Sequence, residues 1–398
     1  MLGRLSSTIR RRSAKRTVPT LHQFSSSSPV HPHRTVRVGN LPVGYNVAQV
    51  VKAIKANPVE KILTKKDHLL IRFFDDAAAE RCVERCTDAK GPTLTMDEDG
   101  SPRLSAEIVA GLGAFNLSRT FRLENLPAAA TEDRLRKKFA AIDGLESLHC
   151  ETNAYVRFLE VNQAIDAAAI FLRKRELDSD LRNTRVVYIN DNDSYDLPDW
   201  CTETEDGGPV QRMVTVNSAS LEVKSFIRQS VRTFEKDHLS VLSFRIFPAT
   251  NNIVMRFPTA DLARSYVNTY QAEASKLGVD LTLEYDDRTE YITRGMVTAL
   301  ALGARRTVRL VLRQNQLKQI VEYHKIFRLF GRLHTIRPQV REETESLIIY
   351  VVFEDIRSAM KCILGLAKPD RLGLDTTYLK GAKVNFFGSR TLAPVSVP

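Results

Sequence analysis

Arginine recurs at one position of a short string that the chain repeats. The strings RTVRV (34–38), RTFRL (119–123) and RTVRL (306–310) alternate polar with apolar residues, which predicts a β-strand with one solvated face. The second arginines of these strings, Arg37, Arg122 and Arg309, fall on that face. A guanidinium group can hold a phosphate through two parallel hydrogen bonds and can stack on a base. The strings therefore indicate nucleic-acid binding, although arginine also suits any solvated sheet face.

A second string follows each of the first at a similar distance. LLIRF (69–73), AYVRF (154–158) and IYVVF (349–353) each end in phenylalanine, and a diverged fourth copy pairs RMVTV (212–216) with IVMRF (253–257). In all four copies an alanine stands six residues after the phenylalanine. A small residue early in the following helix would let that helix lie close to a sheet. The four pairs of strings, with the same spacing from phenylalanine to alanine, indicate a fourfold internal repeat.

The segments between the two strings complete a unit with the order βαββαβ. Helical spacing of apolar residues predicts a first helix in 47–54, 132–142, 223–234 and 317–331, and the second helix opens after each phenylalanine string. The closing strands are predicted in SAEIVA (105–110), TRVVYIN (184–190), DLTLEYD (280–286) and AKVNFFG (382–388). Such a unit is an α+β, ferredoxin-like fold with a four-stranded antiparallel sheet and both helices on one face.

The 398-residue chain divides accordingly into four units and their connections. The predicted boundaries are 34–112 for unit 1, 118–192 for unit 2, 210–288 for a diverged unit 3 and 305–390 for unit 4. Residues 193–209, with six acids and no base, are predicted to be a solvated acidic linker, and 289–304 a second linker. Trp200, the chain's only tryptophan, lies in the acidic linker and is a candidate anchor for a protein partner.

These units resemble the RNA recognition motif family. VRVGNLP (36–42) and FRLENLP (121–127) are similar to that family's first-strand hexapeptide and its exit, and FRLFGRLHTIRP (327–338) is similar to its turn from helix to second strand. The resemblance covers about 34–390 without the linkers. It implies four degenerate tandem copies in a fungal-type mitochondrial protein that binds single-stranded RNA on the open sheet faces.

The family's stacking aromatics are mostly replaced. The hexapeptide position holds Arg37, Arg122, Thr215 and Arg309, and the two octapeptide positions hold His68 and Leu70, Asn153 and Tyr155, Asn252 and Val254, and Ile348 and Tyr350. The resemblance thus implies RNA-binding roles for Arg37, His68, Arg72, Arg122, Tyr155, Arg157, Arg306, Arg309 and Tyr350. Unit 4, with a net charge of +9 over 305–398, is the best candidate, whereas unit 3 is predicted to be structural or to bind protein.

Much of the net charge of +11 comes from the N-terminus, because residues 1–34 contain seven basic residues and no acid. Leu2, Leu5 and Ile9 lie on one side of a helical wheel and the arginines on the other, and a serine tract follows. This composition predicts a mitochondrial presequence over 1–33 and a location in the matrix. The alternatives are a nuclear localisation signal in RRRSAKR or a plain basic tail.

No catalytic constellation, cofactor motif or metal-ligand spacing stands out, so an enzyme is not expected. Cys82 and Cys86 share a helical stripe with apolar residues, which favours core packing. No apolar run approaches the ~20 residues of a membrane span. The sequence therefore predicts a mitochondrial RNA-binding protein whose partner is single-stranded or ribosomal RNA and which acts in processing, stability or translation of organellar transcripts. The alternative is a scaffold, for example a ribosome-associated factor, whose degenerate units bind proteins.

Overall fold

The computed structural model describes residues 33–54, 59–85, 92–97, 102–140, 142–177, 179–189, 210–218, 220–286, 292–313, 320–341, 344–369, 379–389 and 392–398. The predicted presequence up to residue 32, Cys86 and the acidic linker with Trp200 lie outside these residues. The predictions made for them therefore stay predictions.

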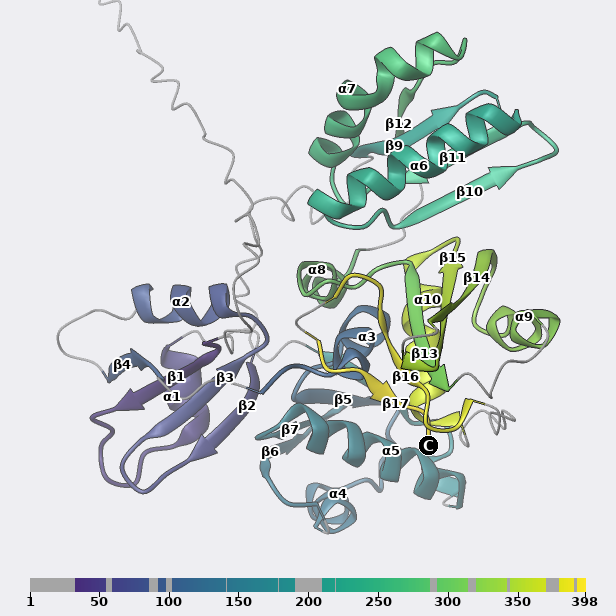
Figure 1. The fold of residues 1–398 in the computed structure, drawn as a ribbon. Helices are drawn as coiled ribbons and strands as arrows, with labels where there is room; N and C mark the ends of the chain where they lie inside the picture. The colour runs from purple at the N-terminus through teal and green to yellow at the C-terminus, as the bar shows by residue number, and fades with distance from the viewer. Residues whose placement is uncertain are drawn as a thin grey trace, which may run out of the picture.

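Units 1 and 2 follow the predicted order of elements (Figure 1). Unit 1 contains β1 (Thr35–Gly39), α1 (Val47–Ala53), β2 (Val59–Thr64), β3 (Leu69–Phe73), α2 (Asp76–Arg85) and β4 (Thr93–Met96). Unit 2 contains β5 (Thr120–Glu124), α4 (Glu132–Phe139), β6 (Leu145–Cys150), β7 (Ala154–Phe158), α5 (Val161–Leu177), the 3-10 turn η1 (Ser179–Leu181) and β8 (Arg185–Ile189). Their antiparallel sheets have the orders β2-β3-β1-β4 and β6-β7-β5-β8.

Units 3 and 4 repeat the same topology. Unit 3 contains β9 (Val210–Val216), α6 (Leu221–Asp237), β10 (Ser243–Phe247), β11 (Asn252–Arg256), α7 (Ala260–Lys276) and β12 (Thr282–Asp286). Unit 4 contains β13 (Thr307–Arg313), α9 (Ile320–Arg328), β14 (Leu333–Arg341), β15 (Ser346–Phe353), α10 (Ile356–Ala367), β16 (Lys383–Phe386) and an added β17 (Val395–Ser396). The sheet orders are β10-β11-β9-β12 and β14-β15-β13-β16-β17. The α+β, RNA recognition motif-like fold class is confirmed.

Alternation along the strands decides which face of each sheet the helices cover. In β1, Val36 and Val38 are fully buried and join the residues of α1 and α2 in one core, whereas Arg37 between them is exposed. The phenylalanine at or directly after the end of each third strand and the alanine six residues later are fully buried in all four units. The repeated pair therefore has the predicted packing role, because an alanine lets the second helix approach the sheet closely.

The prediction of a closing strand at SAEIVA is wrong, because this segment begins a helix, α3 (Ala106–Phe115). Ser105 caps its N-terminus by accepting a hydrogen bond from the Ile108 amide, and Asn116 in the left-handed conformation (φ 54°) ends it. The fourth strand of unit 1 is instead β4. A short apolar run fits a strand or a buried helix equally well, and here burial on almost all sides, between other helices, gave the helix.

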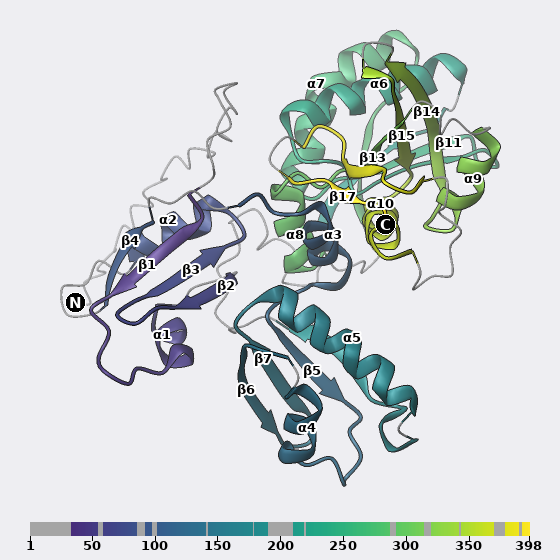
Figure 2. The same cartoon turned by 60° about the horizontal axis from the view of Figure 1, so that its bottom comes forward.

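The predicted linker 289–304 contains a second helix, α8 (Arg294–Ala301), which packs against α3. Figures 1 and 2 show α3 lying between α8 and α10. The contact with α8 is close, since a Cβ at Gly295 would stand 2.2 Å from the Leu112 carbonyl oxygen, and the Gly295 amide donates to Asn116 Oδ1 at 2.9 Å. The connecting helices thus belong to one core with unit 4.

Backbone hydrogen bonds join parts of the chain that are distant in sequence. Near the C-terminus, Ala393 exchanges hydrogen bonds with the strand-like segment before α3, accepting from Ala106 at 2.9 Å and donating to Leu104 at 2.7 Å. Between units 1 and 2, the Ile62 amide donates to the Leu159 carbonyl at 2.8 Å. Between units 3 and 4, the Ile356 amide donates to the Leu242 carbonyl at 2.9 Å, so all four units are connected by more than their linkers.

Candidate nucleic-acid interface

The open face of each sheet carries one cross-strand pair at the predicted binding register. The first strand and the third strand place Arg37 opposite Leu70, Arg122 opposite Tyr155, Thr215 opposite Val254 and Arg309 opposite Tyr350. Directly opposed residues in an antiparallel sheet point to the same face. The structure thus brings these residues together as the register predicted, and the units differ in what surrounds the pair.

In unit 4, four side chains form a row across the sheet. Arg337 of β14 opposes Tyr350 of β15, Tyr350 opposes Arg309 of β13, and Arg309 opposes Asn385 of β16. Next to this row, the Phe387 ring meets Tyr350 edge to face, with the ring centroids 5.3 Å apart. Two aromatic rings flanked by two guanidinium groups can stack bases and hold phosphates on one surface.

Sequence reasoning missed three members of this surface, Arg337, Asn385 and Phe387. Phe387 is 39% exposed, whereas the preceding Phe386 is buried. The doublet in NFFG carried the signal, because strand alternation allows only one of two adjacent phenylalanines to enter the core. Arg337 could have been found in the same way, since it lies two residues after Thr335 on the outer side of β14.

In unit 2, the charges on the open face are already compensated. Arg122 donates to Glu124 Oε1 from both Nε, at 3.0 Å, and Nη2. Hydrogen bonding to Glu124, and then to Tyr155, raises the pKa of Arg122. Tyr155 is 38% exposed, and His149 lies 2.9 Å from Glu151. A phosphate would have to displace a carboxylate here, which makes this face a weaker anion site than that of unit 4.

The outer residues of units 1 and 2 include two more predicted arginines, and both are partly buried. Arg157 donates from Nε to Thr120 Oγ1 at 3.1 Å, and Arg72 lies opposite Thr35 on the open face. The Arg157 guanidinium group is thus held against the sheet, and the Arg72 side chain is only partly exposed.

Unit 1 presents an exposed arginine beside an acid. Arg37 has a side chain 51% exposed and lies 3.9 Å from Asp67, whose other oxygen lies 2.7 Å from His68 Nδ1. The hydrogen bond with His68 is the main cause of the lowered pKa of Asp67. With Leu70 in the place of the stacking aromatic, the binding register of this face presents the exposed Arg37 and the ring of His68.

Arg306 is placed differently from the sequence prediction. Its side chain is only 6% exposed, and it donates to the Phe353 carbonyl at 3.2 Å. Arg34 and Arg119 make the same bond to Phe73 and Phe158, at 2.6 and 2.8 Å. The first arginine of each repeated string therefore points into the unit and joins the first strand to the end of the third. Its spacing of two and four residues from the buried side chains of the same strand indicates this orientation.

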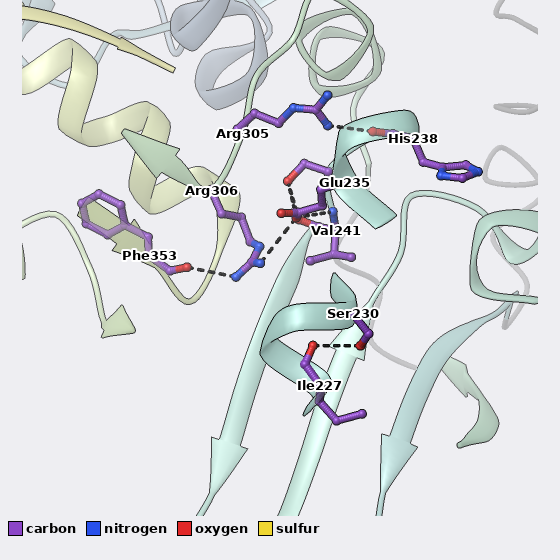
Figure 3. Close-up of polar contacts among 9 residues, drawn as sticks. Ile227, Ser230, Glu235, His238, Val241, Arg305, Arg306 and Phe353 are labelled. Atoms are coloured by element: carbon purple, nitrogen blue, oxygen red, sulfur yellow. Dashed lines mark hydrogen bonds and ion pairs between the residues drawn. The ribbon is translucent and has the colours of Figure 1, made fainter. Parts of the chain in front are cut away.

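Each buried arginine has a carboxylate partner, but unit 4 takes its partner from unit 3. Glu60 and Glu146, at the bulge of the second strand, lie 2.8 and 2.7 Å from Arg34 and Arg119. The corresponding bulge residue of unit 4 is His334. Glu235 of α6 fills the role instead, with Oε1 3.4 Å from Arg306 Nη2 (Figure 3).

A second contact joins the end of α6 to unit 4, because Arg305 donates to the His238 carbonyl at 2.8 Å (Figure 3). Within unit 3, Glu235 Oε1 also accepts from Ser240 Oγ at 2.7 Å and from the Val241 amide at 3.0 Å, which fixes the carboxylate in place. In unit 3 itself, Arg212 and Arg256 both pair with the buried Asp286, at 3.0 and 3.2 Å. The open faces thus differ, but the buried ionic anchors recur.

Within the described residues, no group of three or more His, Cys, Asp or Glu side chains is placed to hold a metal ion. Cys82 is buried among the apolar residues of unit 1. No helix in this part of the chain combines the length and apolar character needed to cross a membrane.

No family model matches the sequence. A curated relative, the "meiotically up-regulated gene 24 protein" of Schizosaccharomyces pombe, is 23% identical over 363 residues. The match covers 84% of this chain but 53% of the relative, so the chain spans about half the length of the curated relative it matches.

Solved structures also match over parts of the chain. The three N-terminal RNA-binding domains of the yeast splicing factor Prp24 align with 64% of this chain and 99% of their own, at 18% identity and a TM-score of 0.20. The Caenorhabditis elegans NONO-1 homodimer aligns with 53% and 87%, at 14% identity and a TM-score of 0.20. RNA recognition domains 1 and 2 of Drosophila melanogaster Sex-lethal align with 39% and 99%, at 13% identity and a TM-score of 0.17. The fold assignment rests on the strand order and register described above.

Proposed function

We propose that this protein binds single-stranded RNA through the open sheet face of unit 4. The observation that carries the proposal is the Tyr350–Phe387 ring pair flanked by Arg309 and Arg337. Aromatic faces stack on any base, and guanidinium groups supply the phosphate contacts that dominate affinity. Unit 2, with Tyr155 and a compensated Arg122, contributes less.

We further propose that the protein works in the mitochondrial matrix on organellar transcripts, in processing, stability or translation. The acid-free, arginine- and serine-rich stretch of residues 1–34 supports the location. A fusion of residues 1–40 to a fluorescent reporter is expected to enter mitochondria and to be shortened there. Accumulation of the reporter in the nucleus would contradict the proposed address. Crosslinking of the whole protein to RNA in isolated mitochondria would then identify the transcript.

The RNA proposal is tested on the full chain with two substitutions in the row. Tyr350→Ala is expected to weaken binding to single-stranded RNA by ~1–3 kcal/mol through lost stacking, with little change in salt dependence. Arg309→Ala is expected to weaken binding and to flatten the slope of log K against log salt by ~0.7 if one phosphate contact is lost. Both side chains lie on the open face, so thermal melting should change little.

Tyr285→Ala provides the matched control, because Tyr285 is 58% exposed in unit 3 and lies outside the row. An unchanged RNA affinity in both Tyr350→Ala and Arg309→Ala would contradict binding on this sheet.

A protein scaffold is the second candidate function, and the face of unit 2 favours it. Glu124 pairs with Arg122 and Glu151 lies beside His149, so that face carries two acids as well as an exposed tyrosine, which suits a protein surface better than a polyanion. Loss of a co-purifying protein after Tyr155→Ala, with RNA affinity intact, is the result expected if unit 2 has this role.

A further inference from the structure

A basic cleft of 450 Å³ lies between helix α6 of unit 3 and strand β14 of unit 4. Its lining consists of Ser225, Arg228, Gln229, Arg232, Thr233, Lys236 and Arg337. Four of these seven residues are cationic, three can donate neutral hydrogen bonds, and none is acidic. All of them are exposed. This composition fits an anionic ligand with several charges.

The cations of α6 are spaced regularly along one side of the helix. Arg228, Arg232 and Lys236 follow each other at four-residue steps, each a rise of about 6 Å along the axis. This step is close to that between neighbouring phosphates of an extended nucleic-acid strand. The opposite side of α6 is buried in the core of unit 3, and Glu235 turns away from the cleft to Arg306. The helix thus presents a row of positive charge without an acid in it.

Arg337 belongs to both the cleft and the row on the unit 4 sheet. It opposes Tyr350, so its side chain rises from the same face as the Tyr350–Phe387 rings, and it also lines the cleft. An RNA strand that crosses the sheet past Tyr350 and leaves over β14 therefore reaches Arg337 and then the cations of α6.

Backbone and ring contacts join units 3 and 4, the two units that supply the walls of the cleft. The Phe244 amide donates to the Glu354 carbonyl at 2.7 Å, and the Ile356 amide donates to the Leu242 carbonyl at 2.9 Å. The rings of Phe244 and His334 meet edge to face with centroids 4.9 Å apart. With the Glu235–Arg306 pair, these contacts place the cations of both units around one space.

The pKa of His334 is lowered by burial and by the positive charge of this region. Burial first, and then the charges of Arg228, Arg306 and Arg337, lower the pKa of His334 to about 4. Two of these three arginines line the cleft. His334 is therefore neutral near pH 7 and adds no charge beside the cleft.

We propose that the α6–β14 cleft binds the phosphodiester backbone of single-stranded RNA, as a continuation of the strand that lies on the unit 4 sheet. The proposal rests on the proposed function, because Arg337 is the residue that connects the two surfaces. In the cleft the arginines and the lysine contact phosphates, and Ser225, Gln229 and Thr233 donate hydrogen bonds to phosphate or sugar oxygens. The cleft reads no bases, and it extends the length of RNA that is bound.

The test compares two triple variants of the full chain that remove the same charge from unit 3. The cleft variant carries Arg228→Gln, Arg232→Gln and Lys236→Gln. The control variant carries Lys224→Gln, Arg264→Gln and Lys276→Gln, three cations of α6 and α7 that do not line the cleft. Binding of fluorescently labelled oligouridylates of about 6 and about 15 nucleotides is measured between 50 and 300 mM salt; the shorter covers the two or three bases that one sheet stacks.

The cleft variant is expected to bind the longer RNA at least about tenfold more weakly at low salt, with a salt slope flatter by about 2 if each cation contacts one phosphate. Its affinity for the shorter RNA should change little, and the control variant should resemble the wild type. Equal losses in both triple variants, or no loss in the cleft variant, would overturn the cleft as an RNA site. Loss of binding to polyglutamate with RNA affinity intact would overturn it too, in favour of an acidic protein.

Tyr350→Ala, measured beside the triple variants, separates this proposal from the proposed function. If Tyr350→Ala weakens both RNAs and the cleft variant weakens neither, the sheet binds RNA and the cleft does not. If the cleft variant weakens the longer RNA and Tyr350→Ala has no effect, the cleft binds RNA and the role of the sheet is refuted. A wild-type chain that binds neither oligouridylate refutes both.

Discussion

The ion pair between Glu235 and Arg306 should contribute measurably to the stability of units 3 and 4. Their side chains are 16% and 6% exposed and their charged atoms lie 3.4 Å apart, so the direct attraction is about 5 kcal/mol at an effective dielectric constant of 20. Desolvation offsets part of this attraction, and the loss of one partner of a buried pair costs ~3–5 kcal/mol. Glu235→Gln leaves Arg306 buried without a carboxylate.

The lower end of that range applies, because a glutamine at 235 still accepts from Ser240 and Val241. We therefore expect the free energy of unfolding to fall by about 3 kcal/mol. For a unit pair of roughly 150–250 residues this lowers the melting temperature by about 6–12 °C. Calorimetry of the full chain measures the shift. Hydrogen exchange of the peptides around 235–244 and 306–312 shows whether opening begins at this contact.

Glu222→Gln is the matched control, since Glu222 is an exposed acid in the first turn of the same helix and its loss costs at most ~1 kcal/mol. A second variant tests the geometry. Adding His334→Glu to Glu235→Gln returns an acid to the bulge position that Glu60 and Glu146 occupy in units 1 and 2, and should recover part of the lost stability. A Glu235→Gln protein that melts like the Glu222→Gln protein would refute the reasoning.

Two other predictions concern packing and pH. Gly295→Ala should destabilise the chain by about 1–3 kcal/mol in denaturant unfolding, because its Cβ would stand 2.2 Å from the Leu112 carbonyl oxygen. Gly39→Ala is the control and should cost much less, since the nearest atom to its Cβ is 3.9 Å away. Equal losses of stability in the two variants would contradict the close contact between α3 and α8. The pKa of His334 is about 4 in the folded chain and about 6.5 in the unfolded chain. Between these pH values the unfolded chain binds more protons than the folded chain. The free energy of unfolding should therefore fall as the pH drops from about 6.5 to about 4. His334→Gln should make the melting temperature less dependent on pH over that window, and an identical pH profile in both proteins would contradict the assignment.

Sequence determined the repeat, the register and most of the fold of each unit. Alternation in RTVRV and its copies assigns Val36 to the core and Arg37 to the open face, because side chains in a strand point alternately to its two sides. The alanine six residues after each third-strand phenylalanine indicates close helix packing, because a small side chain lets the helix approach the sheet. Each of these patterns spans only a few residues, and its repetition in four units makes it recognisable in the sequence.

Tertiary structure decided the features that depend on partners far along the chain. SAEIVA reads as a strand by itself, and it is helical because α8 and α10 surround it. Alternation along the strand puts Arg306 on the buried side, but its carboxylate partner, Glu235, comes from a different unit and is supplied only by the fold. Arg337 and the cations of α6 look like separate solvated residues, and only the docking of unit 3 on unit 4 gathers them into one cleft, because charge density at a site depends on distance in space and not on distance along the chain.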